Sequence, residues 1–294
     1  MATVDQLLRQ LAGRSGDMPY WVLEKDYALS YLLTGIIATP ALRDSLILKG
    51  GTALRKGYFA DYRFSEDLDF SLRPNQSLPD VDNAVQHAVR QMELLLLQRG
   101  PFEASMERLT LRDPHPGSQD AFTVRVRFPA QRQALCRLKI EITRDELVLL
   151  PPAARPLLHS YPEELAVALW CYPLEEIVAE KLRALLQSYA RLQSRGWGAS
   201  RVCRDYYDLW QILRTSELEL DSLPELVQQK SRHRKVTFNA PDEFFAPDLL
   251  ELAHVEWDRL LRPFVPNCPP AQQVLDELRS LAFDIWSETN ENAP

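Results

Sequence analysis

Apolar residues in the first part of the chain recur with two different periods. Over residues 17–36 they recur every three to four positions, behind Asp17 as a potential N-cap and Pro19 in the first turn. One long helix is therefore predicted there, with a shorter helix before it. A short apolar run predicts a buried strand over 45–49, and the pattern behind it predicts a short helix over 50–60.

Alternating polar and apolar residues then predict a series of strands. These strands are expected at 67–72, 102–110, 121–128 and 136–143, with one helix from residue 81 that ends at Gly100. The proline-rich stretch 151–162 interrupts the alternation, and helical periodicity dominates residues 173–289. The pattern therefore predicts an α+β protein, with a mixed sheet flanked by helices followed by a mostly helical part.

The domain boundary is expected in the proline-rich stretch. We expect one part over residues 1–155, including the N-terminal helices, and a helical part over residues 156–294. A chain of 294 residues exceeds the ~100–200 residues typical of one domain. It therefore forms either one large domain or two closely packed parts.

Composition narrows the class of protein. With 46% hydrophobic and 26% charged residues, the chain has the composition of an ordinary globular protein. A net charge of −7 argues against the overall positive surface of a non-specific nucleic-acid binder. Basic residues are nevertheless concentrated locally, over 181–204 and in "KSRHRK" at 230–235. These runs are either solvated helix faces or parts of a binding surface.

Membrane and disulfide classes find no support in the sequence. The longest purely apolar run is the four leucines of 94–97, far below the ~18–20 residues that cross a bilayer. The N-terminus lacks the apolar region of a signal peptide, so we expect a cytoplasmic protein without a membrane partner. The four cysteines have no C-x-x-C spacing, which indicates neither a zinc ribbon nor a disulfide framework.

Two aspartates on the predicted strand 67–72 are the first candidate for chemistry. On a strand, Asp67 and Asp69 point to the same face about 6.6 Å apart, while Leu68 and Phe70 face the core. Two adjacent like charges are unfavourable unless a cation lies between them, and carboxylate oxygens suit Mg²⁺ or Mn²⁺. The alternative is an edge strand whose acids simply face solvent.

The turn before these aspartates has the composition of a phosphate-binding loop. Gly50 and Gly51 let a phosphate approach the main chain, and Thr52 adds a hydroxyl donor. Arg63 and Ser65 supply a guanidinium and a second hydroxyl just ahead of the aspartates. The glycines alone are weak support, because a tight strand-to-helix turn needs glycine for steric reasons.

Taken together, these motifs resemble a known family. "KGGTALRKGYF" at 49–59 followed by "RFSEDLDFSL" at 63–72 is similar to the AbiEii/AbiGii-type nucleotidyltransferase toxins, a branch of the DNA polymerase β-like nucleotidyltransferase superfamily. "WVLEKDYALSYLL" at 21–33, "EEIVAEKLRAL" at 175–185 and "RDYYDLW" at 204–210 resemble further motifs of the branch. The resemblance implies a polymerase β-like nucleotidyltransferase core, Mg²⁺-dependent chemistry with Asp67 and Asp69 as metal ligands, and a nucleoside triphosphate (NTP) donor.

Lys181 occupies the place of the functional lysine in the third motif. On a helix its neighbours three and four residues away are apolar, so its ammonium lies on the inward stripe without an acid beside it on that helix. It therefore needs a partner from another element, or its stem extends to the surface. The resemblance implies that it reaches the phosphates of the donor.

Three further acids are candidates for the site. Asp205 and Asp208 lie at a spacing that also permits helical ion pairs with Arg201 and Arg204, which is an adequate structural explanation by itself. The resemblance implies that one of these acids contributes, and we favour Asp205 as catalytic, with Asp208 on the substrate side. Glu141 matches the third carboxylate of the superfamily, often the general base; pairing with a basic residue is the alternative, and Asp205 would then be the base.

The resemblance also indicates a biological role. Such proteins are toxins of toxin–antitoxin or phage-defence systems, and several modify the 3′ end of tRNA and so block translation. We therefore expect an NTP, tRNA and a cognate antitoxin protein as partners, with the helical part completing the active site. The alternatives are nucleotidyl transfer to a small molecule or to a protein hydroxyl, including that of Ser65, and a catalytically silent partner-binding protein.

Overall fold

The computed structural model of the protein describes residues 3–14, 18–110 and 118–291. The predicted helix cap Asp17 lies outside the described residues. The chain forms two compact units, Met1–Tyr172 and Pro173–Pro294. The sequence pattern predicted the boundary at residue 155, whereas this residue lies in a strand of the first unit's sheet and a further strand of that sheet, Ala168–Cys171, follows it.

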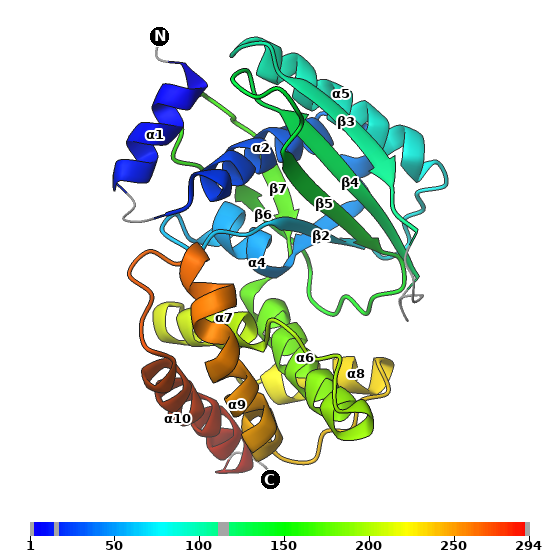
Figure 1. The fold of residues 1–294 in the computed structure, drawn as a ribbon. Coiled ribbons are helices and arrows are strands. Elements are labelled where there is room, and N and C mark those ends of the chain that lie inside the picture. Colours follow the sequence, from blue (N-terminus) through cyan, green and yellow to red (C-terminus); the bar gives the residue numbers. More distant parts are fainter. Residues whose placement is uncertain (1–2, 15–17, 111–117, 292–294) are drawn as a thin grey trace. The chain divides into compact units, whose positions relative to one another are not determined.

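The first unit is built on a mixed sheet of seven strands (Figure 1). Its strands are β1 (Leu46–Lys49), β2 (Asp67–Leu72), β3 (Glu103–Arg108), β4 (Gln119–Arg127), β5 (Cys136–Thr143), β6 (Ala153–Pro156) and β7 (Ala168–Cys171), in the order β3-β4-β5-β2-β1-β7-β6. The strand β2 lies between β5, to which it is parallel, and β1, to which it is antiparallel. Its residues are therefore flanked on both sides by other strands.

Two strands, β6 and β7, were not predicted from the sequence. They are antiparallel to each other, and β7 runs parallel to β1 with Leu48 opposite Cys171. Each has only four residues, and β6 ends at Pro156, a residue that cannot donate a hydrogen bond to a neighbouring strand. Such short segments carry too few alternations to be recognised by period.

Helices cover the sheet of the first unit. They are α1 (Val4–Arg14), α2 (Tyr20–Ile37), α3 (Pro40–Arg43), α4 (Gly50–Ala53), the π-helical turn η1 (Leu54–Tyr58) and α5 (Val81–Leu97). Helix α2 is buried along most of its length and packs against α5 and β5. A Cβ on Gly35 of α2 would collide with the carbonyl oxygen of Ala88 on α5, so the two helices approach closely there.

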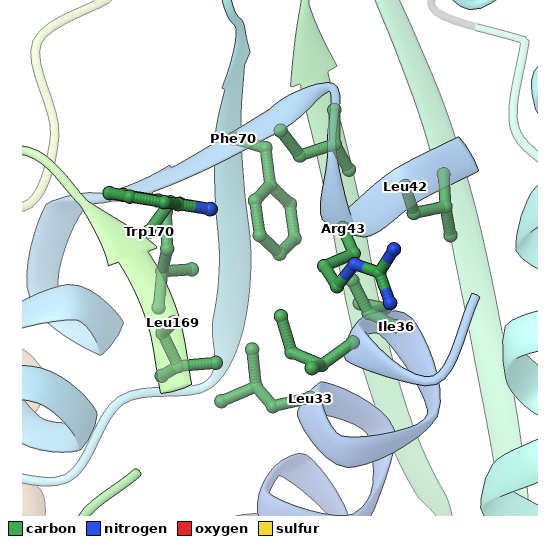
Figure 2. Close-up of a pocket in the computed structure, with 10 residues that line it drawn as sticks. Leu33, Ile36, Leu42, Arg43, Phe70, Leu169 and Trp170 are labelled. Carbon is green, nitrogen blue, oxygen red and sulfur yellow. The ribbon is translucent and has the colours of Figure 1, made fainter. Parts of the chain in front are cut away.

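A small apolar cavity lies between α2, β1, β2 and β7. Figure 2 shows Leu33, Phe70 and Trp170 around it. Its volume is about 10 Å³, the size of about one water molecule. Because ligand pockets measure hundreds of Å³, this space belongs to the packing of the core.

The second unit is helical, as the sequence pattern predicted (Figure 1). It contains α6 (Leu174–Arg195), α7 (Val202–Thr215), α8 (Leu223–His233), η2 (Pro241–Phe245), α9 (Pro247–Glu256), η3 (Trp257–Leu261), η4 (Arg262–Phe264) and α10 (Ala271–Glu291). Helix α7 is central and packs against α6, α9 and α10. Among the described residues, no helix combines the length and the apolar character needed to cross a membrane.

Candidate active site

The acidic face of β2 is the centre of the candidate site in the first unit. Leu68 and Phe70 are 0% and 3% exposed, whereas Asp67 and Asp69 on the opposite face are half-buried. The alternation predicted from the sequence is thus confirmed. The parallel strand β5 places Glu141 directly beside Asp69 in register, so a third carboxylate joins the same face.

The electrostatics of this face work against the ionised form of Asp69. Burial, the carboxylate of Asp67 and that of Glu141 raise the pKa of Asp69 to about 7, although Lys49 and Lys139 act in the opposite direction. Glu141 also forms an ion pair with Lys139 on its own strand, in which Nζ of Lys139 lies 2.8 Å from Oε1 of Glu141. A cation between these carboxylates would relieve their repulsion.

The acids of β2 fit a metal ion that is shared with a substrate. Within residues 3–14, 18–110 and 118–291, no cluster of three or more His, Cys, Asp or Glu side chains is arranged to hold a metal ion. Mg²⁺ is usually held by one or two carboxylates together with substrate phosphates. Two half-buried carboxylates on one strand face, one with a raised pKa, match that pattern better than a closed protein site.

The glycine turn lies directly against the acidic face. Gly50 has φ of 70°, and a Cβ on it would lie 2.9 Å from Oδ2 of Asp69. Only glycine tolerates both the backbone angle and this approach. Thr52, expected to donate to a phosphate, instead donates its hydroxyl to the carbonyl oxygen of Asp67 and is 1% exposed. It therefore ties the turn to β2, and its contact with a phosphate stays a prediction.

Arg63 and Ser65 extend this group. The guanidinium of Arg63 lies so close over Gly51 that a Cβ there would overlap it. Its Nη1 donates to the carbonyl oxygen of Phe64 at 3.2 Å, and the residue is 4% exposed. Ser65 is half-buried in the segment between Arg63 and β2. The first unit thus brings together the glycine turn, the guanidinium and the acids that the sequence indicated.

Sequence reasoning missed Lys49, which lies opposite Asp69 in the β1–β2 register. Its ammonium pairs with Glu146 at 2.9 Å and lowers the pKa of Asp69. The signal was present, because Lys49 ends the strand immediately before Gly50. Its importance depended on the register of two strands, which the motif itself does not state.

In the second unit, Lys181 of α6 is bound to two acids of α7. Its Nζ lies 2.8 Å from Oδ1 of Asp205 and 2.7 Å from Oδ2 of Asp208. The side chain of Asp208 is completely buried, whereas that of Asp205 is 26% exposed. The expected partner from another element is therefore this pair, and Asp205 is the acid of the two that reaches solvent.

Some basic residues of the two runs are buried and cannot belong to a binding surface. Arg204 is 8% exposed, donates from Nε to the carbonyl oxygen of Leu260 at 2.9 Å and lies over the ring of Phe264. Lys230 is 2% exposed and pairs with Glu176 at 2.6 Å. Both cations therefore lie in the interior of the helical unit rather than on its surface. The exposed basic residues that remain in the 181–204 run are Arg191, Arg195 and Arg201.

Comparison with solved structures supports the nucleotidyltransferase fold. The nucleotidyltransferase toxin MenT4 (Rv2826c) from Mycobacterium tuberculosis H37Rv is 19% identical with a TM-score of 0.62, over 97% of this chain and 90% of that one. A putative nucleotidyltransferase from H. pylori is 20% identical with a TM-score of 0.53, over 92% of this chain and 99% of that one. A search of curated proteins finds no match to the chain.

A family model gives the assignment. The model for the nucleotidyl transferase AbiEii toxin of type IV toxin–antitoxin systems matches residues 31–280. The match contains the glycine turn, the acids of β2 and the Lys181 cluster, and it agrees with the mixed sheet described above. The chain therefore belongs to the AbiEii family of nucleotidyltransferase toxins.

Proposed function

We propose that this protein transfers a nucleoside monophosphate from an NTP to the 3′ end of tRNA, and thereby blocks translation as the toxin of a toxin–antitoxin pair. The observation that carries the proposal is the acidic face of β2 with the glycine turn against it. Gly50 leaves room for Asp69, and Arg63 lies over Gly51. The site therefore combines carboxylates, which suit a metal ion, with a guanidinium, which suits a polyphosphate.

The donor would bind through the positive part of this site. Arg63 offers a guanidinium that suits phosphate oxygens, and Ser65 offers a hydroxyl close to the acids. Gly50 and Gly51 lack side chains, so a phosphate can approach the main chain at the turn. These groups orient the triphosphate, and orientation accounts for much of the catalysis in phosphoryl transfer.

The reaction is an in-line displacement at the α-phosphate. The hydroxyl oxygen of the acceptor forms a bond to phosphorus while the bond to pyrophosphate breaks, and pyrophosphate leaves with the electron pair. A Mg²⁺ ion held by Asp67 and Asp69 would neutralise charge on the phosphates. Glu141 lies beside Asp69 and would accept the proton of the attacking hydroxyl; Asp205 is the alternative base.

Lys181 is proposed to serve the same donor. Its ammonium is already held between Asp205 and Asp208, whose carboxylates offset the cost of removing its charge from water. Asp208, completely buried, would orient this lysine on the substrate side, whereas Asp205 retains access to solvent. The support for this role is the place of Lys181 in the family motif together with its paired, oriented ammonium.

The acceptor and the partner are inferred from surface charge and family. Arg191, Arg195 and Arg201 remain exposed in the second unit and suit contacts to RNA phosphates. Membership in a type IV toxin–antitoxin family supports a cognate antitoxin protein as a further partner.

One assay tests the proposal. The purified protein is incubated with Mg²⁺ and each of the four NTPs labelled at the α-phosphate, with separate pools of tRNA, protein and small hydroxylated compounds. We expect label on tRNA, and loss of label with Asp67→Ala, whose fold is checked by circular dichroism. Label found only on protein or on small compounds would show that tRNA is not the acceptor. Absence of label from every pool would contradict nucleotidyl transfer itself.

A further inference from the structure

A buried charge cluster lies in the first unit outside the residues assigned to the site. Arg55 and Lys56 of η1 are 8% and 1% exposed, and both face Asp26 of α2, itself 2% exposed. Oδ1 of Asp26 lies 2.6 Å from Nε of Arg55 and 2.8 Å from Nζ of Lys56. Its other oxygen accepts a hydrogen bond from the hydroxyl of Tyr161 at 2.6 Å.

Arg55 also contacts the two residues that flank Arg63. Its Nη1 donates to the carbonyl oxygen of Tyr62, and its guanidinium carbon lies 3.6 Å from the ring centroid of Phe64. Arg55 therefore holds the residues immediately before and after Arg63. Between these two fixed neighbours, the side chain of Arg63 extends over Gly51.

Each contact in this series has a physical reason to be rigid. A buried carboxylate that faces two cations and a hydroxyl is fixed by charge-assisted hydrogen bonds. A planar guanidinium can bind a carboxylate and a carbonyl in its plane while stacking an aromatic ring on its face, a combination that lysine cannot reproduce. The turn η1 is π-helical, a local geometry that often occurs at functional sites.

We propose that Asp26 and Arg55 are positioning residues for Arg63. Asp26 fixes Arg55, Arg55 fixes the backbone on both sides of Arg63, and Arg63 is thereby held over Gly51 before the donor arrives. The inference rests on the proposed function, because it assigns Arg63 to the triphosphate. Preorganisation of this kind raises affinity without adding a contact to the ligand.

Two substitutions break the series and a third serves as a matched control. Arg55→Lys keeps the charge but cannot hold Asp26, Tyr62 and Phe64 together, and Asp26→Asn weakens the hold on Arg55. Lys56 is the other cation that contacts Asp26, and its Nζ also donates to the hydroxyl of Ser30 at 3.0 Å. Lys56→Met removes this cation and leaves the ion pair between Asp26 and Arg55 in place.

The first readout is the dissociation constant of the full chain for each of the four NTPs with Mg²⁺, by calorimetry. We expect about a tenfold weaker affinity for Arg55→Lys and Asp26→Asn, and an unchanged value for Lys56→Met. KM should rise more than kcat falls in the labelled-transfer assay. Unchanged affinity in Arg55→Lys would overturn the inference.

A double-substitution cycle shows whether the effect passes through Arg63. In an Arg63→Ala background, Arg55→Lys should cause no further loss of affinity, because the side chain that it positions is gone. A second tenfold loss in that background would mean that Arg55 acts by another route. A general structural effect would lower affinity equally in both backgrounds.

Hydrogen exchange gives a readout that is independent of the donor. Amides of residues 61–66 should exchange faster in Arg55→Lys than in the original protein, and at the original rate in Lys56→Met. Asp26→Asn leaves two buried cations without a full counter-charge and therefore lowers stability. The inference is therefore judged on Arg55→Lys, which keeps the charge of the cluster. A protein that binds none of the four NTPs would contradict the proposed function. Unchanged exchange in Arg55→Lys would separately contradict the positioning of Arg63 by Arg55.

Discussion

The carboxylate of Asp69 shows how a functional residue can oppose stability. Its neighbours on the strand face, Asp67 and Glu141, are acids, and burial adds to their effect on its pKa. A group whose pKa is raised by folding binds its proton more tightly in the folded protein. Between its ordinary pKa near 4 and about 7, the folded state therefore holds more protons than the unfolded state, and stability falls as pH rises.

Asp69→Asn should accordingly stabilise the metal-free protein at pH 8, by on the order of 2 kcal/mol, because the amide has no charge to repel. Thermal unfolding with EDTA at pH 5 and pH 8 measures this effect, which should be smaller at pH 5. The exposed Asp61→Asn serves as control. Addition of Mg²⁺ with an NTP should stabilise the original protein more than Asp69→Asn. A destabilised Asp69→Asn at pH 8 would contradict the repulsion.

Gly51 leaves the space that the guanidinium of Arg63 occupies, because it has no side chain. In Gly51→Ala the added methyl group would overlap the guanidinium of Arg63, which is the movable end of a flexible side chain. We therefore expect a small change in stability, below about 1 kcal/mol, and about a tenfold weaker NTP affinity. Unfolding curves and calorimetry on the same sample separate the two effects. An unchanged affinity would show that Arg63 need not lie over the turn.

At the scale of elements, the packing of α2 against α5 holds the first unit together behind the sheet. Gly35→Ala should force these helices apart, because its Cβ would meet the carbonyl oxygen of Ala88, a main-chain atom that cannot turn away. We expect a loss of about 1–3 kcal/mol in the free energy of unfolding, measured with urea.

Gly13→Ala is the matched control for this change. Gly13 lies in helix α1, and nothing lies within 4 Å of the position its Cβ would take. Alanine there should stabilise by up to about 1 kcal/mol, because glycine loses more conformational freedom in a helix. Equal effects of the two substitutions would mean that the α2–α5 contact is looser than described.

The second unit has its own element-scale feature, the buried ion pair between α6 and α8. Glu176 is 0% exposed and faces Lys230 at 2.6 Å. Lys230→Met should therefore destabilise the protein by about 3–5 kcal/mol, because it leaves a buried carboxylate without its partner. Lys230→Met combined with Glu176→Gln should recover part of that loss. Thermal unfolding measures both, and a mild effect of Lys230→Met alone would contradict the pairing.

At the scale of the whole molecule, the two units carry different parts of the proposed activity. The first contains the groups proposed to bind the donor, and the second contains Lys181 with its acids and an exposed set of arginines. The buried positions of Arg204 and Lys230 remove two cations from the expected RNA-binding surface, whose exposed residues are Arg191, Arg195 and Arg201 of the first run and Arg232 and Lys235 of the second. An acidic protein with such a local basic set should bind RNA in a salt-dependent manner.

Charge reversal at Arg191, Arg195 and Arg201 to glutamate should lower transfer to tRNA at least tenfold at 0.15 M salt, while NTP affinity stays unchanged. The salt dependence of tRNA binding should also become shallower. A control with reversal at the exposed Arg14, Arg90 and Arg132 produces the same net charge elsewhere. Equal losses in both variants would show that net charge, rather than this surface, governs RNA binding.

Much of the fold was predictable from local patterns. The alternation around Asp67 predicted strand β2 and its buried face, and the helical periods predicted α2, α5 and the helical second unit. The strands β6 and β7 were missed, because four residues with nearby prolines carry no period. The pairing of β6 with β7, and of β7 with β1, exists only once the sheet has formed.

The sequence by itself determined which chemical groups are present and in what order. The motifs with Asp67 and Asp69, the paired glycines and the later Lys181 carried the resemblance to the nucleotidyltransferase toxins, because a motif is a local feature of the sequence. Only the tertiary structure decided which groups meet. It assigned the hydroxyl of Thr52 to β2, buried Arg204 and Lys230, and connected Asp26 through Arg55 to Tyr62 and Phe64, the two neighbours of Arg63. Such contacts depend on strand register and helix packing, which bring together residues that are distant in the chain.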